Sequence, residues 1–482
     1  MNGSKKLTIV QMNDSHAYMD IHQEMFWRGD QAVYRPAGGY ARIATIVKQI
    51  RAKSQGSCLF CDCGDTLHGT YPALNTQGQA LIPILNSLGL DAMTAHWEFA
   101  YGPKVFQQRV SELNYPMLAI NVYNKGTGEL VFPSYIMKEI GGLRIGLVGI
   151  ASNIVDKSMP PVYSEGMHFT LGREKLPQII DNLRSQEKAD LIVLISHLGF
   201  PHDMKLLSEV KGIDVCLSGH THNRLYKPVL QGKTIVIQSG CHGSFLGRLD
   251  VTVEGGKIVD YQHQLIEVGT SIKPDPAVDD LVKQALAPYK DNLSEVVGET
   301  ATALNRGTIL ESTMDNFLLQ ALIDSTGAQL AFSNGWRYGA PIVPGKITLN
   351  DLYNIIPMNP PVSTVELTGE ELRVMLEENL ERTFSCDPYQ QMGGYVKRCL
   401  GLNVYFKIEN PQGHRIQKLF AGNEEVQPGR YYTAAFVTPQ GIPQKYGRNR
   451  ENRSEHIIDA MRTYLVSHRP FSAELRGTFV AV

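Results

Sequence analysis

The first 270 residues alternate short apolar runs with stretches in which apolar positions recur every three or four residues. The runs have the length of buried strands, and the stretches between them have the period of amphipathic helices. We expect strands at 7–10, 58–61, 144–150, 191–195, 213–217 and 234–238, and helices at 41–51, 79–88 and 175–186. This alternation is typical of an α/β layer fold.

A polar segment that contains prolines follows at 273–297, and its apolar positions keep the spacing of an amphipathic connecting helix. A second α/β pattern begins at 298, with helices expected at 313–326 and 369–383. A chain of 482 residues is also long for one domain. We therefore expect a first domain at 1–270, a helical linker at 271–297 and a second domain at 298–482.

The net charge of −2 gives no electrostatic reason to expect a nucleic acid or an anionic membrane as a partner. No apolar run approaches the roughly 18 residues that a membrane span needs. The first residues show no basic head followed by an apolar stretch, so no signal peptide is expected. The chain as it stands is therefore expected to be cytoplasmic, and periplasmic or extracellular if a signal was removed.

Acidic and histidine residues follow the expected strands directly, at the point where each strand ends. They are Asp14 and His16, Asp65, His96 and Glu98, His197, and His220 and His222. Because ligands bind at the carboxyl ends of the strands in α/β sheets, we expect these side chains to converge. Asp and His together suit Zn²⁺, Mn²⁺ or Fe. A single histidine after a strand is usually structural, but the joint pattern predicts a metal site, and the two imidazoles on the tight turn after Gly219 can address two adjacent ions.

The same motifs carry a family resemblance. Asn13-Asp14-Ser15-His16, Gly64-Asp65, His96-Trp97-Glu98-Phe99, His197 and Gly219-His220-Thr221-His222, in this order, resemble the calcineurin-like metallophosphoesterases. The segments 333–337, 345–348 and 367–372 resemble the C-terminal domain of the 5'-nucleotidase family. The resemblance implies a four-layer catalytic sandwich of two sheets flanked by helices, followed by a smaller α/β domain that binds the substrate.

Carried over to this chain, the resemblance implies two divalent ions, Mn²⁺ or Zn²⁺, and attack by a bridging hydroxide. The first ion would be held by Asp14, His16, Asp65 and His222. Asp65 would bridge to the second ion, which His197 and His220 would complete together with His96, where the family usually has an asparagine. We count Asp65, His96 and Trp97 as the catalytic candidates.

The segment around Trp97 departs from the family pattern. Trp97 replaces the histidine that usually lies over the scissile group, and Ala100 replaces the aspartate that pairs with it. An indole N–H cannot supply a titrating proton, and a general acid contributes about 10²–10⁴-fold. The site should therefore favour leaving groups that need little protonation. Two alternatives stay open: Trp97 is only a packing residue, or His68 or His242 acts as the acid.

The substrate-binding candidates lie in the second half, where Arg337 is retained from the family and Asn334 and Trp336 flank it. Met358 stands where nucleotidases have an aromatic ring, Tyr446 is a loose candidate for the second ring, and Leu310 replaces one of the usual arginines. The base and phosphate contacts of a nucleotidase are therefore only partly matched.

A further resemblance links the His-Trp-Glu-Phe run and the segments 73–79 and 387–394 to the thiosulfohydrolase branch of the family, in bacterial sulfur oxidation. Those enzymes release sulfate from a cysteine-S-thiosulfonate on a carrier protein. Three functions therefore remain: a 5'-nucleotidase-type phosphoesterase acting on nucleotides or related phosphate esters, which we prefer; a thiosulfohydrolase-like enzyme; and a non-catalytic binding protein that retains its metals. The expected partner is a small phosphate or sulfur-ester substrate, or a carrier protein that bears it.

Overall fold

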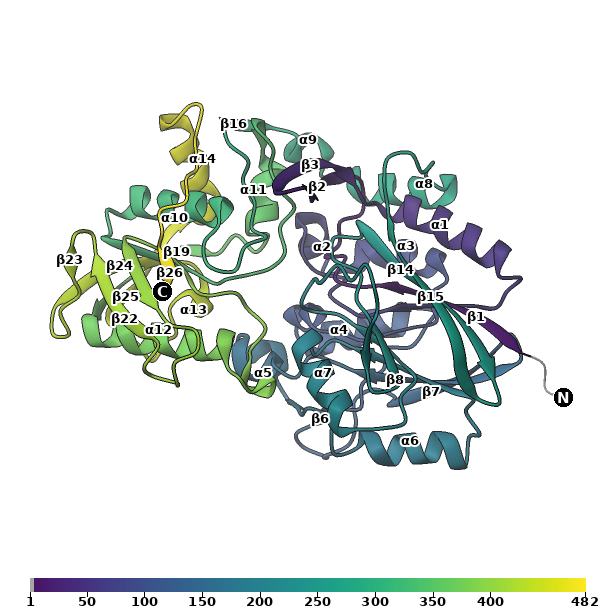
Figure 1. Cartoon of the computed structure of the whole chain (residues 1–482). Helices are drawn as coiled ribbons and strands as arrows, with labels where there is room; N and C mark the ends of the chain where they lie inside the picture. Colours follow the sequence, from purple (N-terminus) through teal and green to yellow (C-terminus); the bar gives the residue numbers. More distant parts are fainter. Residues whose placement is uncertain (1–3) are drawn as a thin grey trace. The chain divides into compact units, whose positions relative to one another are not determined.

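The computed structural model describes residues 4–482. The chain forms two compact units (Figure 1). The first unit comprises Met1–His22 and Pro36–Pro288, and the second comprises Gln23–Arg35 and Tyr289–Val482. Each unit has its own sheets and its own apolar core.

Two sheets stack face to face in the first unit. The first has the order β15 (Lys257–Glu267), β14 (Phe245–Glu254), β1 (Lys5–Met12), β4 (Cys58–Asp62) and β5 (Ala92–Met93). The second has the order β12 (Val229–Gln231), β13 (Thr234–Ile237), β11 (Val215–Ser218), β10 (Leu191–Ser196), β8 (Leu143–Ile150) and β7 (Tyr135–Ile140). A short pair, β6 (Val122–Asn124) and β9 (Met167–Phe169), lies apart from them.

Apolar side chains from both sheets form one core between them. Ile9 and Leu59 from the first sheet join Val193 and Leu217 from the second, and each is essentially inaccessible to solvent. Burial of this apolar surface is the main force that holds the two sheets together. A second cluster lies on the other face of β8 and β10, where Leu183 and its neighbours cover it.

Helices complete the four layers of the first unit. Helices α6 (Leu176–Ser185) and α7 (Phe200–Glu209) contribute to the cluster outside the second sheet. Helices α1 (Tyr40–Lys53), α3 (Ile82–Leu88) and α8 (Pro276–Leu286) pack on one another and lie beside the first sheet in Figure 1. The shorter helices are α2 (Tyr71–Asn75), α4 (Pro103–Glu112) and α5 (Val155–Ser158). This is the expected α/β sandwich, and the strands predicted from the apolar runs are all present.

The segment expected to be a linker is not a single connecting helix. Helix α8 belongs to the first unit, because Val278 and Val282 are buried and the helix packs on α1 and α3. Asp275 caps its first turn by accepting a hydrogen bond from the Val278 N–H at 3.3 Å. The short helix α9 (Lys290–Leu293) already lies in the second unit. A hairpin of β2 (His22–Arg28) and β3 (Gln31–Ala37), not anticipated from the sequence, contributes residues 23–35 to the second unit.

The second unit is a smaller α/β fold. Its main sheet has the order β20 (Arg398–Leu400), β17 (Leu330–Ser333), β24 (Tyr431–Phe436), β19 (Pro361–Thr368) and β25 (Arg448–His456). A second sheet comprises β23 (Glu424–Glu425), β22 (Ile416–Ala421), β21 (Leu402–Phe406) and β26 (Phe479–Ala481), and β16 (Val296–Thr300) pairs with β18 (Gly345–Thr348). The helices are α10 (Thr313–Thr326), α11 (Leu349–Ile355), α12 (Gly369–Phe384), α13 (Thr438–Gly441) and α14 (Ile457–Ser467).

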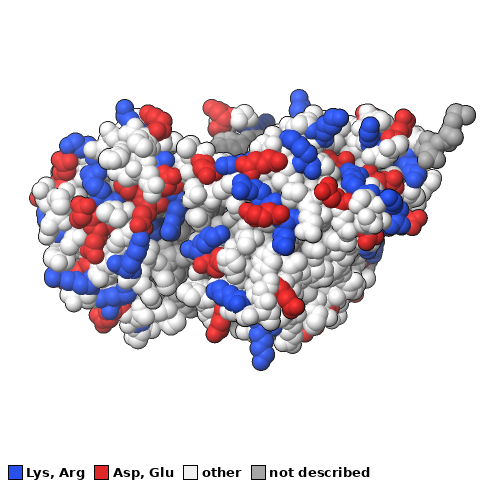
Figure 2. Space-filling model, turned by 90° about the horizontal axis from the view of Figure 1, so that it is seen from below, with Lys and Arg blue, Asp and Glu red and all other residues white. Residues whose placement is uncertain are grey.

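Local sequence sets where these helices begin. Thr348 and Thr368 each start a helix with a capping box, in which the threonine side chain and an acidic residue three positions later satisfy two free backbone N–H groups. Within residues 4–482, no helix is long and apolar enough to span a bilayer. On the face shown in Figure 2, basic and acidic side chains are interspersed, as a net charge of −2 allows.

Candidate metal centre

Parallel strands bring the predicted ligands to one edge of the first unit. β1 runs parallel to β4, and β10 runs parallel to both β8 and β11, so their carboxyl ends carry the turns at 13–17, 63–66, 197–199 and 219–223. Gly64 has a φ of 90° and lies so close to the next strand that an added Cβ would be 2.7 Å from the Thr94 carbonyl oxygen. Only glycine fits there, and the residue after it is Asp65.

The ligand-bearing turns also hold several non-glycine residues in the left-handed region. The φ angles are 51° for Asp14, 47° for His16, 57° for Asp65, 72° for His220 and 57° for His222. Residues other than glycine rarely adopt this conformation, which costs energy and clusters at functional sites. The surrounding structure therefore imposes a specific direction on each of these side chains.

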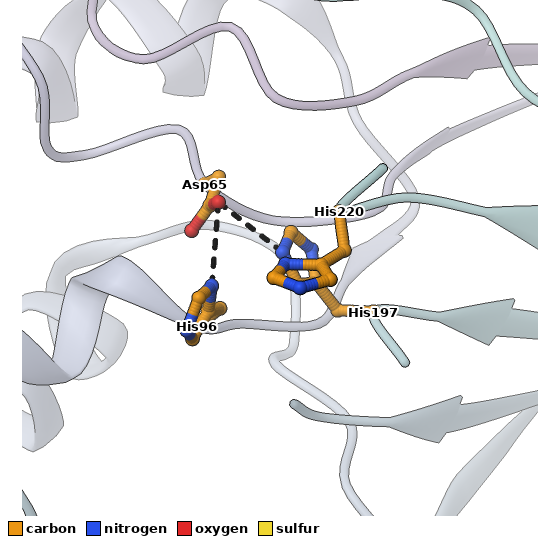
Figure 3. Close-up of side chains that lie close together, drawn as sticks. All are labelled: Asp65, His96, His197 and His220. Atoms are coloured by element: carbon orange, nitrogen blue, oxygen red, sulfur yellow. Dashed lines mark hydrogen bonds and ion pairs between the residues drawn. The ribbon is translucent and has the colours of Figure 1, made fainter. Parts of the chain in front are cut away.

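Four of the predicted ligands form one cluster, here called group B (Figure 3). It consists of Asp65, His96, His197 and His220, whose candidate ligand atoms all lie within 4.8 Å of one another. Asp65 Oδ2 is 3.4 Å from His96 Nδ1 and 3.2 Å from His197 Nε2. All four residues are buried, which leaves little water to hydrate their polar atoms.

The other three predicted ligands form group A, which consists of Asp14, His16 and His222. His222 Nε2 lies 3.3 Å from Asp14 Oδ1 and 3.2 Å from His16 Nε2. Asp65 Oδ2 also lies 3.7 Å from His16 Nε2, so this carboxylate is close to imidazoles of both groups. The position suits a bridging carboxylate between two ions roughly 3.5–4 Å apart. That Asp65 bridges two ions stays a prediction.

Backbone groups orient the ligand side chains. His197 Nδ1 hydrogen-bonds the Cys63 carbonyl oxygen, and His16 Nδ1 lies 3.3 Å from the carbonyl oxygen of His68. In both rings Nε2 is thereby turned toward the cluster, as in metal sites where the second ring nitrogen is held by a carbonyl. The Trp97 N–H donates to Asp65 Oδ1 at 2.7 Å, which fixes that carboxylate.

Glu98 bonds the main chain of the turns rather than a ligand ring. Its carboxylate accepts the backbone N–H of His96 at 2.8 Å and that of Thr66 at 2.6 Å. Glu98 therefore fixes the main chain of the two turns that carry His96 and Asp65.

Burial and charge act in opposite directions on the titratable groups. Burial alone would raise the pKa of Asp65, but His197 and His96 hold it well below its usual value. Burial would likewise raise the pKa of Asp14, and His222 and His197 lower it. Burial would lower the pKa of His197, and Asp65 and Asp14 raise it to about 10. Two ionised carboxylates are thus buried among imidazoles, an arrangement that attracts positive charge.

The residues present fit a pair of divalent cations. The donor atoms are carboxylate oxygens and imidazole nitrogens, which suit Zn²⁺ or Mn²⁺. The Nε2 atoms of His16 and His222 face each other. They can hydrogen-bond directly only if one of these two nitrogens carries a proton. His96 Nδ1 likewise faces the Asp65 carboxylate, at 3.4 Å. Bound cations would give these converging atoms a shared partner.

The aromatic residue next to the centre is buried rather than open to solvent. The Trp97 ring stacks on His68, with centroids 5.0 Å apart and planes 22° apart, and it is 8 % exposed. Burial lowers the pKa of His68 to about 4, so this histidine is neutral at pH 7 and is a poor reservoir of protons there. The His242 ring lies 6.2 Å from the His16 ring, centroid to centroid.

The predicted substrate-binding residues all lie in the second unit. Asn334, Trp336 and Arg337 follow β17, and Met358 follows α11 and is 41 % exposed. The Arg337 guanidinium lies 5.1 Å from the centroid of the Tyr395 ring. Trp336 is buried, with the Arg306 guanidinium 5.8 Å from its ring centroid, which favours a packing role for its ring. Their contacts with a substrate stay a prediction.

Both the second unit and the whole chain are similar to known 5'-nucleotidases. Residues 295–438 match the model of the 5'-nucleotidase C-terminal domain. Snake venom 5'-nucleotidase from Naja atra is 26 % identical over 86 % of the chain and 85 % of its own length. Residues 295–438 therefore form a domain of the 5'-nucleotidase C-terminal type, and the chain as a whole is similar to 5'-nucleotidases. The trifunctional nucleotide phosphoesterase YfkN of Bacillus subtilis is 25 % identical over 86 % of this chain, which spans only 30 % of that longer protein.

A solved structure resembles the whole chain more fully than the sequence matches suggest. The sulfate thiohydrolase SoxB of Thermus thermophilus, solved in complex with glycerol, superposes with a TM-score of 0.93. The two sequences are 25 % identical, and the match covers 99 % of this chain and 96 % of the SoxB chain. This agrees with the resemblance to the thiosulfohydrolase branch seen in the sequence motifs.

Sequence reasoning missed the residues that hold the ligands in place. Asn13 and Gln238 are buried, and both hydrogen-bond to ligand-bearing turns. Their positions carried a weak signal, because Asn13 immediately precedes a candidate ligand and Gln238 is a polar residue that ends an apolar run.

Proposed function

We propose that this protein is a two-metal hydrolase that cleaves phosphate esters, with nucleotides or related small molecules as substrates. The observation that carries the proposal is the pair of buried groups, A and B, with Asp65 close to imidazoles of both. Two bound divalent ions, Mn²⁺ or Zn²⁺, would supply Lewis-acid activation and neutralise charge on the ester. The match of residues 295–438 to a 5'-nucleotidase domain and the similarity to 5'-nucleotidases support hydrolysis as the reaction class.

The protein's own residues would contribute orientation rather than proton transfer to the leaving group. The backbone N–H of Trp97 fixes the Asp65 carboxylate, and backbone carbonyl oxygens fix the rings of His197 and His16. The indole of Trp97 carries no titrating proton, and His68 beneath it is neutral at pH 7. The enzyme should therefore work best on leaving groups that depart without protonation.

A leaving-group series tests this function. The metal-loaded protein is assayed with aryl phosphates of decreasing leaving-group pKa and with nucleoside 5'-monophosphates. We expect kcat/KM for the best aryl phosphate to exceed that for nucleotides by up to about 10²–10⁴-fold, the contribution of a general acid. A flat series, with chemistry shown to limit the rate, would mean that an acid operates. In that case loss of the acid in His68→Ala or His242→Ala should restore the steep series.

A thiosulfohydrolase-like reaction is the second candidate. It is favoured by Trp97 and Ala100, since a departing thiolate, with a free-thiol pKa of about 8.5, needs no acid. The structural similarity to the sulfate thiohydrolase SoxB also supports this reaction. A peptide that carries a cysteine-S-thiosulfonate distinguishes the candidates: release of sulfate at a rate above that of every phosphate ester would favour this reaction. A metal-loaded protein that turns over no substrate of either class would instead be a non-catalytic binding protein.

The role of Arg337 needs a separate test. Its planar guanidinium suits phosphate or sulfonate oxygens. We expect Arg337→Ala to lower kcat/KM for the best substrate at least about tenfold, the loss of one charge-assisted contact. The control is Arg430→Ala, which removes an exposed arginine paired with Glu424 in the same unit. Equal activity of the two variants would contradict the assignment.

A further inference from the structure

A short segment after β13 contacts two turns that carry candidate metal ligands. The segment is 238–242, here called the clasp, and the two turns are 13–16 and 219–223. All three ligands of group A, Asp14, His16 and His222, lie on these two turns. Of group B, only His220 does.

The Gln238 side chain holds the 219–223 turn. Its Nε2 donates to the Gly219 carbonyl oxygen at 2.7 Å, and its Oε1 accepts from Thr221 Oγ1 at 3.0 Å and from the Asn223 N–H. The Gly240 N–H adds a bond to the Asn223 carbonyl oxygen at 2.8 Å. These bonds fix the turn on both sides of His220 and His222.

Asn13 holds the other turn on the clasp. Asn13 Oδ1 accepts the Ser239 N–H at 2.9 Å, and Nδ2 donates to the Gly240 carbonyl oxygen at 2.7 Å. The same Nδ2 donates to Asp14 Oδ2 at 2.6 Å, and the His242 N–H donates to the Asp14 carbonyl oxygen at 2.7 Å. Asn13 therefore connects the clasp to the carboxylate of a candidate ligand.

The clasp bonds are shielded from water, and the turns that they hold carry all three ligands of group A but only His220 of group B. Asn13 is 2 % exposed, and Gln238 is fully buried. The other ligands of group B are fixed from elsewhere, since Asp65 is held by the Trp97 N–H and His197 by the Cys63 carbonyl oxygen. A loss of the clasp bonds should therefore move Asp14 and His222 more than Asp65 and His197.

We propose that Asn13 and Gln238, acting through the clasp, are positioning residues that set the cation affinity of group A in preference to group B. This rests on the proposed two-metal function. Partners that orient metal ligands typically contribute about 10–100-fold in affinity when they are removed.

The test measures metal binding rather than catalysis. The full chain is stripped with a chelator, dialysed and titrated with Mn²⁺ by calorimetry. We expect two equivalents on the wild type, and in Asn13→Ala a loss of about 10–100-fold in affinity for one equivalent with little change in the other. The matched control is Asn121→Ala. Asn121 is buried and, like Asn13, donates two side-chain hydrogen bonds and accepts one, but none involves a carboxylate: it donates to the Ala151 and Thr170 carbonyl oxygens and accepts from the Ala151 N–H.

Each outcome decides. Selective weakening in Asn13→Ala, with both affinities retained in Asn121→Ala, supports the clasp. Unchanged affinities, equal weakening of both equivalents, or the same loss in Asn121→Ala overturns it. If Asn13→Ala does not fold, Gln238→Met, which is similar in size and uncharged and removes both hydrogen-bonding groups of the side chain, gives the same decision. A wild-type chain that binds fewer than two equivalents overturns the proposed function itself, and the clasp with it.

Discussion

Each unit buries a cluster of charged side chains, and the two clusters differ in how they are satisfied. In the first unit, imidazole nitrogens and carboxylates of groups A and B converge on one another. In the second unit, Arg306 and Arg398 both contact the Asp315 carboxylate, at 3.0 Å and 2.9 Å. Further donors of Arg306 bond the Tyr338 and Ile355 carbonyl oxygens, and those of Arg398 bond the Ile309 and Thr308 carbonyl oxygens.

This difference in bonding partners indicates different roles for the two clusters. The arginine cluster has partners within its own unit, so it serves the fold. The histidine cluster instead has imidazole nitrogens that face one another beside two carboxylates, an arrangement that suits added cations. Buried ring nitrogens that converge on one another therefore point to a ligand site, whereas buried charges paired within their unit point to a structural role.

The largest expected effect comes from removing the carboxylate that groups A and B share. Asp65→Ala should lose both metal equivalents. Its activity should fall at least about 100-fold, because residues that merely orient a metal ligand already contribute about 10–100-fold. Elemental analysis of the dialysed protein measures the metal. Two equivalents still bound would contradict the shared role of Asp65. Asp214→Asn, at a partly buried carboxylate paired with Arg184, is the control and should keep both.

A carboxylate in the arginine cluster should matter for stability alone. Asp315→Asn leaves two buried guanidinium groups without a counter-charge, so we expect a loss of about 3–5 kcal/mol in the free energy of unfolding. Chemical denaturation measures it, and metal content should not change. Asp324→Asn, at an exposed position of the same helix, should stay within about 0.5 kcal/mol of the wild type. Equal stability of the two variants would contradict the comparison.

Metal removal should affect one cluster and not the other. Cation at 100 times its dissociation constant stabilises the folded state by about 2.7 kcal/mol, and a chelator removes that contribution. Hydrogen exchange should therefore become faster at 13–16 and 219–223, while segments around Arg306 and Arg398 keep their protection. Faster exchange in both clusters alike would mean that they do not differ in this way.

The smallest effect concerns Lys397, a buried amine that donates to the Gln440 and Gly441 carbonyl oxygens. Burial lowers its pKa to about 7, with Arg382 adding to the effect. The pKa of a lysine in the unfolded chain is near 10.4. Between pH 7 and that pH, the unfolded chain binds a proton that the folded chain has lost, so this lysine makes the free energy of unfolding rise with pH. Lys397→Met should lower that slope by less than about 1.4 kcal/mol per pH unit. Denaturation curves at pH 7 and pH 9 measure it, and equal slopes would contradict the depressed pKa.

The sequence predicted the strands of the first unit well, because each is a short, almost wholly apolar run that ends in a polar turn. It also predicted that Asp14, Asp65, His197 and His222 would lie together, since the carboxyl ends of parallel strands meet at one edge. It could not show that α8 packs into the first unit, because an amphipathic pattern does not say which surface covers its apolar face. The hairpin of β2 and β3 was missed for a similar reason: its membership of the second unit depends on contacts distant in sequence.

The roles of polar residues were harder to predict than their positions. Glu98 follows a strand as the candidate ligands do, yet it binds backbone N–H groups, a role set by local geometry that no sequence pattern records. The bonds of Asn13 and Gln238 reach across more than 200 residues or between neighbouring turns, so they appear only in three dimensions.

The left-handed backbone at Asp14, His16, Asp65, His220 and His222 has a consequence for how such a chain changes over generations. A glycine at any of these positions would relieve backbone strain of the order of 1 kcal/mol or more. Selection for stability alone would therefore favour mutations that erase the ligands one after another. A descendant released from the need to hold cations should drift toward glycine at these turns first, while its strands and its arginine cluster persist.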